Sequence, residues 1–448
     1  MTRDNASPYT ARNVWALAAP MILSNITVPL LGIVDTAVMG HLENPVYVGA
    51  VAVGGTIFSF LFVGLNFLRM GTTGLAAQAH GAGDTNEMRT VLIQAVIIGL
   101  GLAILLIALQ RPIGTLALWL IAPDADVLAP ALTYFNVRIW AAPGALANFA
   151  LVGWFIGMQN TRAPFYIMLV TNLTNIALSL LFVVGFGYRT GGVALASVIA
   201  EFTGLLVGAW LARRELSGFA GQLIKSHLLD PARLRRIVSV NANILVRTMS
   251  LMFVFGFVTA QGARQGTALL AANAILINFQ YFMAYALDGF AHSAEALVGR
   301  ALGERNIAGL RKAFRYSLYW SAGVAILFTA AYLIAGTRIV ALLTSQTELR
   351  EVTIRYLPWI IVSPLFSFWS FLFDGVFIGA TWAREMRNTM VISTFAVFIP
   401  VFYLFRGMGM GNDGLWLAFL VFMVARAVSM GWTYRHKEKL LVSSLATS

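Results

Sequence analysis

The sequence predicts an all-α polytopic membrane protein, with twelve transmembrane helices in two pseudo-symmetric six-helix bundles. Three observations predict this fold class. Hydrophobic residues make up 59% of the 448 residues and charged residues 11%, whereas soluble domains have roughly 45–50% and 25%. Twelve apolar runs are long enough to cross a bilayer, which takes about 17–25 residues. The two halves of the chain also resemble each other at a nearly fixed offset.

The twelve apolar runs follow one another with short polar connections. They cover residues 14–39, 47–69, 90–109, 131–157, 165–186, 192–212, 236–260, 268–292, 316–336, 353–379, 389–405 and 414–434. The first run is too long for the core of a signal peptide, and no A-x-A cleavage pattern ends it. We therefore expect it to be a retained helix.

The net charge of +12 is typical of a positive-inside membrane protein and does not require a nucleic acid partner. With an even number of spans, both termini lie on one side, which carries 20 Lys and Arg against 7 on the other. Because the positive side is the cytoplasmic one, we expect both termini in the cytoplasm. The chain has no cysteine, so neither a disulfide nor a thiolate metal site is expected.

A basic, partly amphipathic segment at 213–235 separates a first bundle, 1–212, from a second, 236–448. We expect this cytoplasmic linker to lie along the membrane surface.

The two bundles match in sequence. At an offset of 222, Phe155-Ile156-Gly157 matches Phe377-Ile378-Gly379, and at an offset of 220 Gly83-Asp84 matches Gly303-Glu304. No acid within the spans of one half aligns with an acid of the other. Six spans per half give both bundles one orientation, related by a pseudo-two-fold axis along the membrane normal.

Asp35 is an ionisable acid within the first run. A charge at mid-bilayer costs roughly 2.5–3.5 kcal/mol on insertion scales, so this side chain must be paired, hydrated or protonated. The same run carries Pro20 and Pro29, and each proline removes a backbone hydrogen bond and favours a bend. This combination predicts a proton-coupling residue on a helix with two proline hinges.

Polar residues of the fifth and sixth runs are the expected neighbours of Asp35. Their spacing places Asn172, Asn175 and Ser179 on one helical face, and Ser197 and Glu201 on another. We predict that these five side chains complete the proton-coupling site. The alternative is that the Asn and Ser residues only join helices by hydrogen bonds.

A second polar set is predicted in the second half. It consists of Arg247, Tyr281, Tyr285, Asp288, His292, Glu295 and Asp374. One interpretation is a cation or substrate site. The other is a salt-bridge network, for example between Arg247 and either Asp288 or Asp374, that holds the bundle together.

Several functions have no matching motif. There is no phosphate-binding G-x-x-x-x-G-K-[ST] sequence, no His/Cys metal set and no Ser-His-Asp arrangement. We therefore expect neither an enzyme nor a bound cofactor or metal, and an ion gradient as the energy source. Aromatic residues make up 12% of the chain and methionines number 16. A vestibule rich in methionine and phenylalanine would suit bulky apolar cations, through adaptable packing and cation–π contact, but most of these side chains are expected to face lipid or neighbouring helices.

The sequence resembles the multidrug and toxic compound extrusion (MATE) family, and within it the DNA-damage-inducible F (DinF) branch. The first half carries this resemblance in PMILSNITVPLLGIVDTAVMGHL and VAVGGTIFSFLFVGLNFLRMGTTGLAAQAHGAGD. The second half carries it in AYALDGFAHSAEALVGRALG and LFDGVFIGATWAREMRN.

The resemblance implies a V-shaped pair of six-helix bundles that export amphipathic, often cationic compounds in exchange for protons or sodium ions. It implies that Asp35 is the coupling acid and that its helix bends when protonated. The family's fifth helix carries N-x-x-x-D, but here the pattern ends in Ser179 instead of an acid. The expected second carboxylate is missing there, which places the coupling on Asp35.

We predict a proton-coupled multidrug antiporter of the bacterial inner membrane that works by alternating access, with one chain sufficient as a monomer. Three alternatives remain at this point: sodium coupling through Asp288, Glu295 and Asp374, a flippase for lipid-linked precursors, and a membrane-embedded enzyme acting on lipids.

Overall fold

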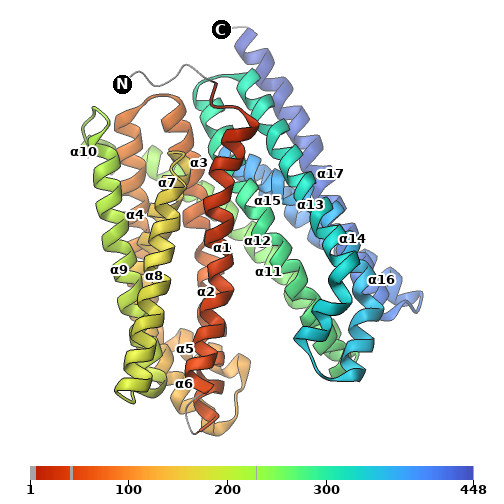
Figure 1. The fold of residues 1–448 in the computed structure, drawn as a ribbon. Helices are drawn as coiled ribbons and strands as arrows, with labels where there is room; N and C mark the ends of the chain where they lie inside the picture. Colours follow the sequence, from red (N-terminus) through yellow and green to blue (C-terminus); the bar gives the residue numbers. More distant parts are fainter. Residues whose placement is uncertain (1–6, 41–43, 229, 447–448) are drawn as a thin grey trace. The chain divides into compact units, whose positions relative to one another are not determined.

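The computed structural model describes residues 7–40, 44–228 and 230–446, and the side chains of all of these except 28–40, 225, 445 and 446. Every regular element in this part of the chain is a helix (Figure 1). The elements up to residue 228 are α1 (Ala11–Gly40), α2 (Val46–Leu65), α3 (Phe67–Gly81), α4 (Thr85–Ala108), α5 (Gln110–Ile121), α6 (Ala125–Arg138), η1 (Ile139–Ala141), α7 (Ala142–Gly157), α8 (Arg162–Leu180), η2 (Leu181–Gly185), α9 (Arg189–Ser217) and α10 (Lys225–Leu228). The remaining elements are α11 (Pro231–Arg264), α12 (Thr267–Gly303), α13 (Ile307–Leu343), α14 (Thr347–Gly379), α15 (Ala383–Val391), η3 (Ile392–Phe398), α16 (Ile399–Gly407) and α17 (Gly411–Ala446).

These helices confirm the predicted all-α membrane architecture. Within the described residues, 11 helical runs are long and apolar enough to cross a membrane, and they coincide with the second to twelfth predicted runs. The first predicted run falls within α1, which has 30 residues and is therefore about 45 Å long. The short helices α5 and α10 are connections between spans.

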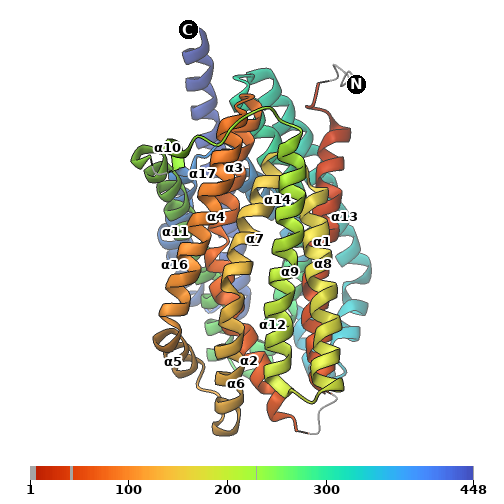
Figure 2. The same cartoon turned by 90° about the vertical axis from the view of Figure 1, so that its left-hand side faces the viewer.

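The chain divides into two compact units, and the division falls inside α1. The first-half unit is Leu23–Val238, and the second-half unit is Ser239–Ser448 together with Met1–Ile22. Inside the first-half unit α7 packs against α3, α4 and α9, as Figure 2 shows. Inside the second-half unit α14 packs against α12, α13 and α17. The bundle boundaries expected from the sequence, 1–212 and 236–448, stay a prediction.

Paired glycines bring the central helices of each unit into close contact. A Cβ atom at Gly153 of α7 would lie 2.3 Å from the carbonyl oxygen of Arg69 in α3. A Cβ atom at Gly375 of α14 would lie 2.3 Å from the carbonyl oxygen of Ala291 in α12. Gly157 and Gly379, one turn later, make the same kind of approach. Both pairs are G-x-x-x-G sequences, which let membrane helices approach closely.

Backbone conformation shows the internal repeat independently of residue identity. Residues with positive φ recur 222 positions apart, and the pairs are Gly83 with Arg305, Gln159 with Thr381, Gly187 with Gly409 and Arg189 with Gly411. The predicted offset of 220 around Gly83-Asp84 is therefore wrong. Asp84 and Asn306, which are also 222 apart, are the residues that cap α4 and α13 with their side chains. Asp and Asn can both cap a helix. Asp84 therefore corresponds to Asn306, although its neighbourhood matches that of Glu304 in residue type.

The linker between the two halves is attached to α4. Arg89 donates from Nη2 to the carbonyl oxygens of Leu216 at 2.7 Å and Phe219 at 2.9 Å. Gln94 donates to the carbonyl oxygen of His227 at 2.9 Å. These side chains of α4 satisfy backbone acceptors at the end of α9, just after it and in α10, so the linker has a fixed course along the first-half unit.

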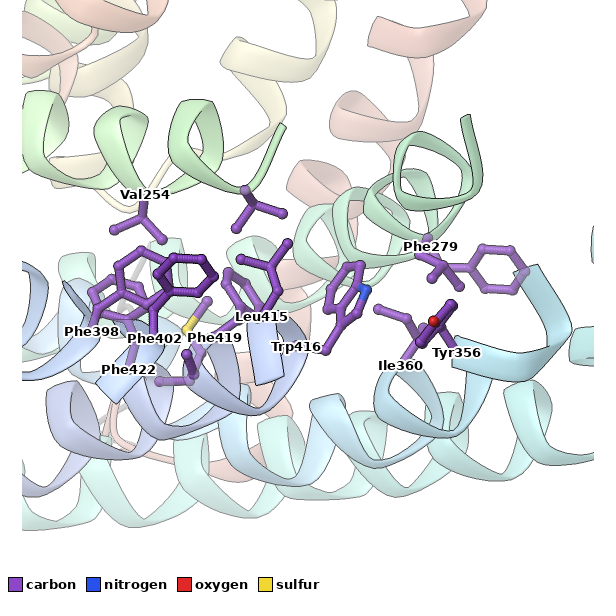
Figure 3. Close-up of a cluster of buried hydrophobic side chains, with 14 of the residues drawn as sticks. Val254, Phe279, Tyr356, Ile360, Phe398, Phe402, Leu415, Trp416, Phe419 and Phe422 are labelled. Atoms are coloured by element: carbon purple, nitrogen blue, oxygen red, sulfur yellow. The ribbon is translucent and has the colours of Figure 1, made fainter. Parts of the chain in front are cut away.

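A hydrophobic cluster rich in aromatic residues runs through the second-half unit and takes side chains from the elements α11 to α17 (Figure 3). Phe419 and Phe422 of α17 lie beside Phe398 and Phe402, and Trp416 lies further along the cluster, toward Ile360 and Tyr356. The indole of Trp416 donates to Oδ1 of Asn273 at 2.9 Å, so its polar atom is satisfied inside the apolar cluster.

The segment before α1 is bound to the second-half unit outside the spans. Tyr9 is 3% exposed and donates its hydroxyl to Oε2 of Glu304 at 2.6 Å, while Arg300 donates to Oε1 at 2.7 Å. Burial acts to raise the pKa of Glu304, but the hydrogen bonds from Tyr9 and Arg300 outweigh it and leave the pKa below its usual value. Burial, followed by the bond to Glu304, raises the pKa of Tyr9.

These pKa shifts predict that the contribution of the Tyr9–Glu304 contact to stability does not change with pH across the neutral range. Because the folded-state pKa of Glu304 is lowered, its contribution to stability is complete above its ordinary pKa of about 4.3 and is lost as the pH falls through the folded value. The contribution of Tyr9 is complete below about pH 10. We expect Tyr9→Phe to cost roughly 0.5–1.5 kcal/mol, measured as a thermal-unfolding difference in detergent that is constant from about pH 5 to 9. The difference should narrow below about pH 4, and a difference that grew on acidification would contradict this account.

The glycine contacts predict a strong asymmetry between two alanine substitutions in the second-half unit. Gly375→Ala should lower stability by roughly 1–3 kcal/mol, because its Cβ overlaps a backbone oxygen that cannot move aside. Gly256→Ala in α11 is the matched control, since a Cβ there meets nothing within 4 Å and alanine favours the helix. Thermal unfolding in detergent measures both variants. Equal effects would show that close approach is not what requires glycine.

Candidate functional site

Asp35, the predicted coupling acid, lies in the part of α1 whose side chains are outside the described residues, as does Pro29. Pro20 is described and half-buried in α1. The predicted roles of all three stay predictions.

The polar residues expected around Asp35 fall into two contacts within the first-half unit. Asn172 of α8 donates its Nδ2 to the hydroxyl of Thr27 in α1 at 2.8 Å. Asn175, one turn further along α8, instead donates to Ser197 of α9 at 2.7 Å. Ser179 donates to Oδ1 of Asn175 at 3.4 Å. The shared face of α8 therefore contacts both α1 and α9, and among the described side chains Asn172 is the one bonded to the helix that carries Asp35.

Glu201 does not join the contact between Asn175 and Ser197, although it shares a face of α9 with Ser197. Its partner is Asn148 of α7, which donates Nδ2 to the Glu201 carbonyl oxygen at 2.9 Å and to its carboxylate at 3.0 Å. Arg138, at the end of α6, acts on this carboxylate through its charge. Asn148 was not predicted as a site residue, because it is a lone amide in the apolar stretch 141–157.

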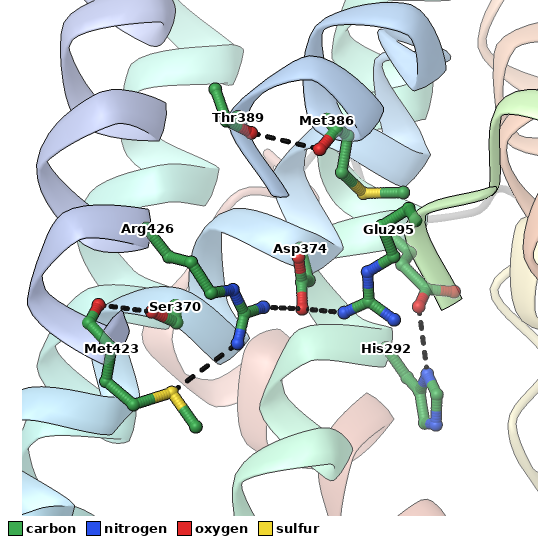
Figure 4. A network of polar contacts seen from close by, with 9 residues as sticks. His292, Glu295, Ser370, Asp374, Met386, Thr389, Met423 and Arg426 are labelled. Carbon is green, nitrogen blue, oxygen red and sulfur yellow. Dashed lines mark hydrogen bonds and ion pairs between the residues drawn. The ribbon is translucent and has the colours of Figure 1, made fainter. Parts of the chain in front are cut away.

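Asp374 lies in a buried ion cluster of the second-half unit (Figure 4). Its Oδ2 accepts hydrogen bonds from Arg247 of α11 and from Arg426 of α17, the latter at 2.7 Å. The three residues are 6%, 2% and 7% exposed for Arg247, Arg426 and Asp374. Of the two interpretations, the structure shows the salt bridge between Arg247 and Asp374. Arg426 was missed as a partner, although an arginine within a span is itself a signal that a buried acid lies nearby.

The predicted polar residues on α12 differ in exposure along the helix, and they become more buried from Tyr281 to Glu295. Tyr281 is 41% exposed, and its ring lies 5.5 Å from that of Phe255. Tyr285 and Asp288 are half-buried. His292 and Glu295 are buried, with Nδ1 of His292 3.1 Å from Oε1 of Glu295. The described contacts therefore place His292 with Glu295, and Asp374 with the two arginines.

No group of three or more His, Cys, Asp or Glu residues in the described part of the chain is arranged to hold a metal ion. Asp374, one of the acids considered for sodium, already accepts two guanidinium donors on one oxygen. Two positive charges beside this carboxylate repel a further cation.

The ion cluster predicts a large loss of stability when its acid is neutralised. Asp374→Asn leaves two buried guanidinium groups without a counter-charge, which costs roughly 3–5 kcal/mol. The triple variant that adds Arg247→Gln and Arg426→Gln should recover much of this loss, because the stranded charges are gone. Thermal unfolding in detergent measures both.

Glu385→Gln is the matched control for Asp374→Asn. Glu385 pairs with Lys437 at 2.5 Å in a more exposed position, and such pairs contribute roughly 0–1 kcal/mol. A smaller loss for Asp374→Asn than for Glu385→Gln would refute the cluster's structural role.

The chain is similar to known membrane proteins over nearly its whole length. It is 43% identical to the DNA damage-inducible protein F of Escherichia coli (strain K12) over 424 residues, which cover 94% of this chain and 91% of the relative. It is 24% identical to the multidrug resistance protein MdtK of Edwardsiella ictaluri (strain 93-146), over 97% of this chain and 98% of that protein.

Solved structures share the fold. A crystal structure of MATE in the bent conformation has a TM-score of 0.89 at 19% identity, covering 98% of both chains. The outward-facing structure of a multidrug resistance MATE family transporter has a TM-score of 0.87 at 17% identity, covering 98% of this chain and 97% of that one.

The MatE family model matches twice, at residues 20–181 and 242–404. The two matches start 222 residues apart, which is the spacing of the positive-φ residues and of the helix caps in the structure. Together with the relative at 43% identity, they show that the chain belongs to the MatE family of membrane transporters.

Proposed function

We propose that this protein exports amphipathic, cationic compounds in exchange for protons by alternating access, with Asp35 as the coupling acid. The names of two relatives, MdtK of Edwardsiella ictaluri and the probable multidrug resistance protein NorM of Rhizobium meliloti (strain 1021), support drug efflux.

The relatives also favour a bacterial inner membrane as the location of this protein. The 20 to 7 distribution of positive residues favours cytoplasmic termini. One chain holds both halves, so a monomer is sufficient.

The neutralisation of Asp374 by two arginines is the observation that favours protons over sodium. A sodium site in the second half would need carboxylates that are free to bind a hard cation. Asp374 is instead engaged by Arg247 and Arg426, and Glu295 lies beside His292. Proton coupling needs only one carboxyl that exchanges a proton, and Asp35 on a proline-containing helix meets that need.

The first-half contacts support a role for the helix that carries Asp35. Thr27 lies about two turns before Asp35 on α1 and accepts a hydrogen bond from Asn172. Ser24 of α1 donates to the sulfur of Met168 in α8 at 2.8 Å. These single, side-chain contacts hold α1 to α8 through groups that exchange partners at low cost. In the proposed cycle, protonation of Asp35 removes a charge from α1, and α1 then bends at Pro20 and Pro29.

An ion-swap assay in proteoliposomes tests this function. Ethidium transport should follow an imposed pH gradient in the absence of sodium, and it should not follow a sodium gradient at constant pH. Asp35→Asn should abolish ethidium-dependent proton flux, because the amide cannot bind a proton at neutral pH.

Asp126→Asn, the same substitution at an exposed acid in the first turn of α6, is the control and should transport normally. Full proton-coupled export by Asp35→Asn would refute the proposal. Transport driven by sodium alone would establish the sodium-coupled alternative instead.

A further inference from the structure

The position of Glu201 in the first-half unit is fixed by close helix packing. A Cβ atom at Gly144 of α7 would lie 3.0 Å from the carbonyl carbon of Glu201. A Cβ atom at Gly204 of α9 would lie 2.2 Å from the hydroxyl of Thr171 in α8. Because α9 is held against both neighbours at this level, the half-buried carboxyl of Glu201 has a defined place beside Asn148.

Asn148 can bond to Glu201 in either protonation state. Its Nδ2 donates to the carboxylate, and its Oδ1 is buried without a hydrogen-bond partner. Asn148 is 6% exposed, so this unused acceptor lies in the protein interior. If Glu201 takes up a proton, a turn of the amide presents Oδ1 to the new O–H donor. The carboxylate and the acid therefore both have a partner in the same residue.

Arg138 is the charged group that faces Glu201. Among the described elements packed against α9, the helices α2, α7, η1 and η2 carry no charged side chain. Asp126 lies in the first turn of α6, about three turns from Arg138, and Arg162 lies at the far end of α8. Arg138 holds its guanidinium over the rings of Phe58 and Phe62, at 5.8 and 6.0 Å. Its Nε and Nη1 are buried without hydrogen-bond partners.

Glu201 and Asp374 differ in whether a salt bridge must break when the carboxylate takes up a proton. Asp374 accepts two guanidinium donors directly, so protonation would break both bonds and strand two buried charges. Glu201 accepts a neutral amide, and Arg138 acts on it without ion-pair contact among the described residues. Glu201 can therefore gain or lose a proton without breaking a salt bridge.

Comparison of the two halves shows which part of the Asn148–Glu201 contact is shared and which part is found in the first half. The residues 222 positions after Asn148 and Glu201 are Ser370 and Met423, and Ser370 donates to the Met423 carbonyl oxygen at 2.9 Å. The hydrogen bond to the backbone is thus present in both halves, as a helix-to-helix contact. The residue 222 positions after Arg138 is Ile360, which is fully buried. The ionisable pair exists in the first half alone.

We propose that Glu201 is a second proton-exchanging carboxyl of the first half, with Asn148 as its partner in both protonation states and Arg138 as its counter-charge. This inference rests on the proposed proton antiport. One proton binds the carboxylate on one side of the membrane and leaves on the other. No other covalent bond changes, and the Asn148 amide turns with each step. Glu201 would thereby supply, from α9, the acid that Ser179 does not provide on α8.

The number of protons exchanged per ethidium tests this inference in the full-length protein. In proteoliposomes, the pH gradient that just balances an ethidium gradient gives this ratio. We expect Glu201→Gln, which keeps the shape and loses the proton, to lower the ratio by about half. An unchanged ratio in a variant that folds normally would overturn the inference and leave the proposed antiport intact. Absence of proton flux in the wild type would overturn both.

Asn148→Ser is a second variant that copies the contact made by Ser370. It should keep the bond to the backbone and lose the bond to the carboxylate, so the protein is expected to fold even if Glu201→Gln does not. Hydrogen bonds to a charged group are the stronger ones, so their loss disfavours the carboxylate. The pH of half-maximal ethidium transport should then move upward, by about one unit. A merely structural role would change the thermal midpoint and leave this pH unchanged, and that result would overturn the proposal.

Discussion

In each half of the protein, one helix approaches its neighbour so closely that only glycine fits between the two backbones. Gly153 and Gly157 bring α7 onto α3, and Gly375 and Gly379 bring α14 onto α12. Lipid tails are as apolar as the side chains, so association of helices in a bilayer depends on such close contact and on hydrogen bonds. The span that ends in α7 is accordingly 83% buried in its most apolar stretch, whereas that of α13 is 17% buried.

The same contacts determine where polar groups are placed. Asn148 precedes the glycine pair of α7 by about one turn, and Asp374 immediately precedes Gly375 on α14. Both side chains are therefore held in the interior of their units, where an unpaired polar group is costly. The second half meets this cost by placing two arginines on one carboxylate. The first half uses a neutral amide for Glu201. This difference suits a structural role for Asp374 and proton exchange for Glu201.

Segments outside the spans are also held by specific bonds. Tyr9 and Arg300 share the carboxylate of Glu304 in the second-half unit. Arg89 and Gln94 bind backbone oxygens of the linker in the first-half unit. In both places a side chain in or directly after a helix of the unit bonds to a group of the connecting segment. Each unit therefore includes part of the chain that leads into or out of it.

The sequence by itself determined the helices, the membrane class and the two-fold repeat, because each depends on composition and periodicity along the chain. Its error of two residues near Asp84 arose where a helix cap accepts either of two residue types. Only the tertiary structure decided the partners of the polar side chains. Helical spacing places Asn172 and Asn175 on one face, yet one reaches α1 and the other α9. The pairing of Asp374 with Arg426, 52 residues away, likewise depends on which helices become neighbours, and packing between helices determines that.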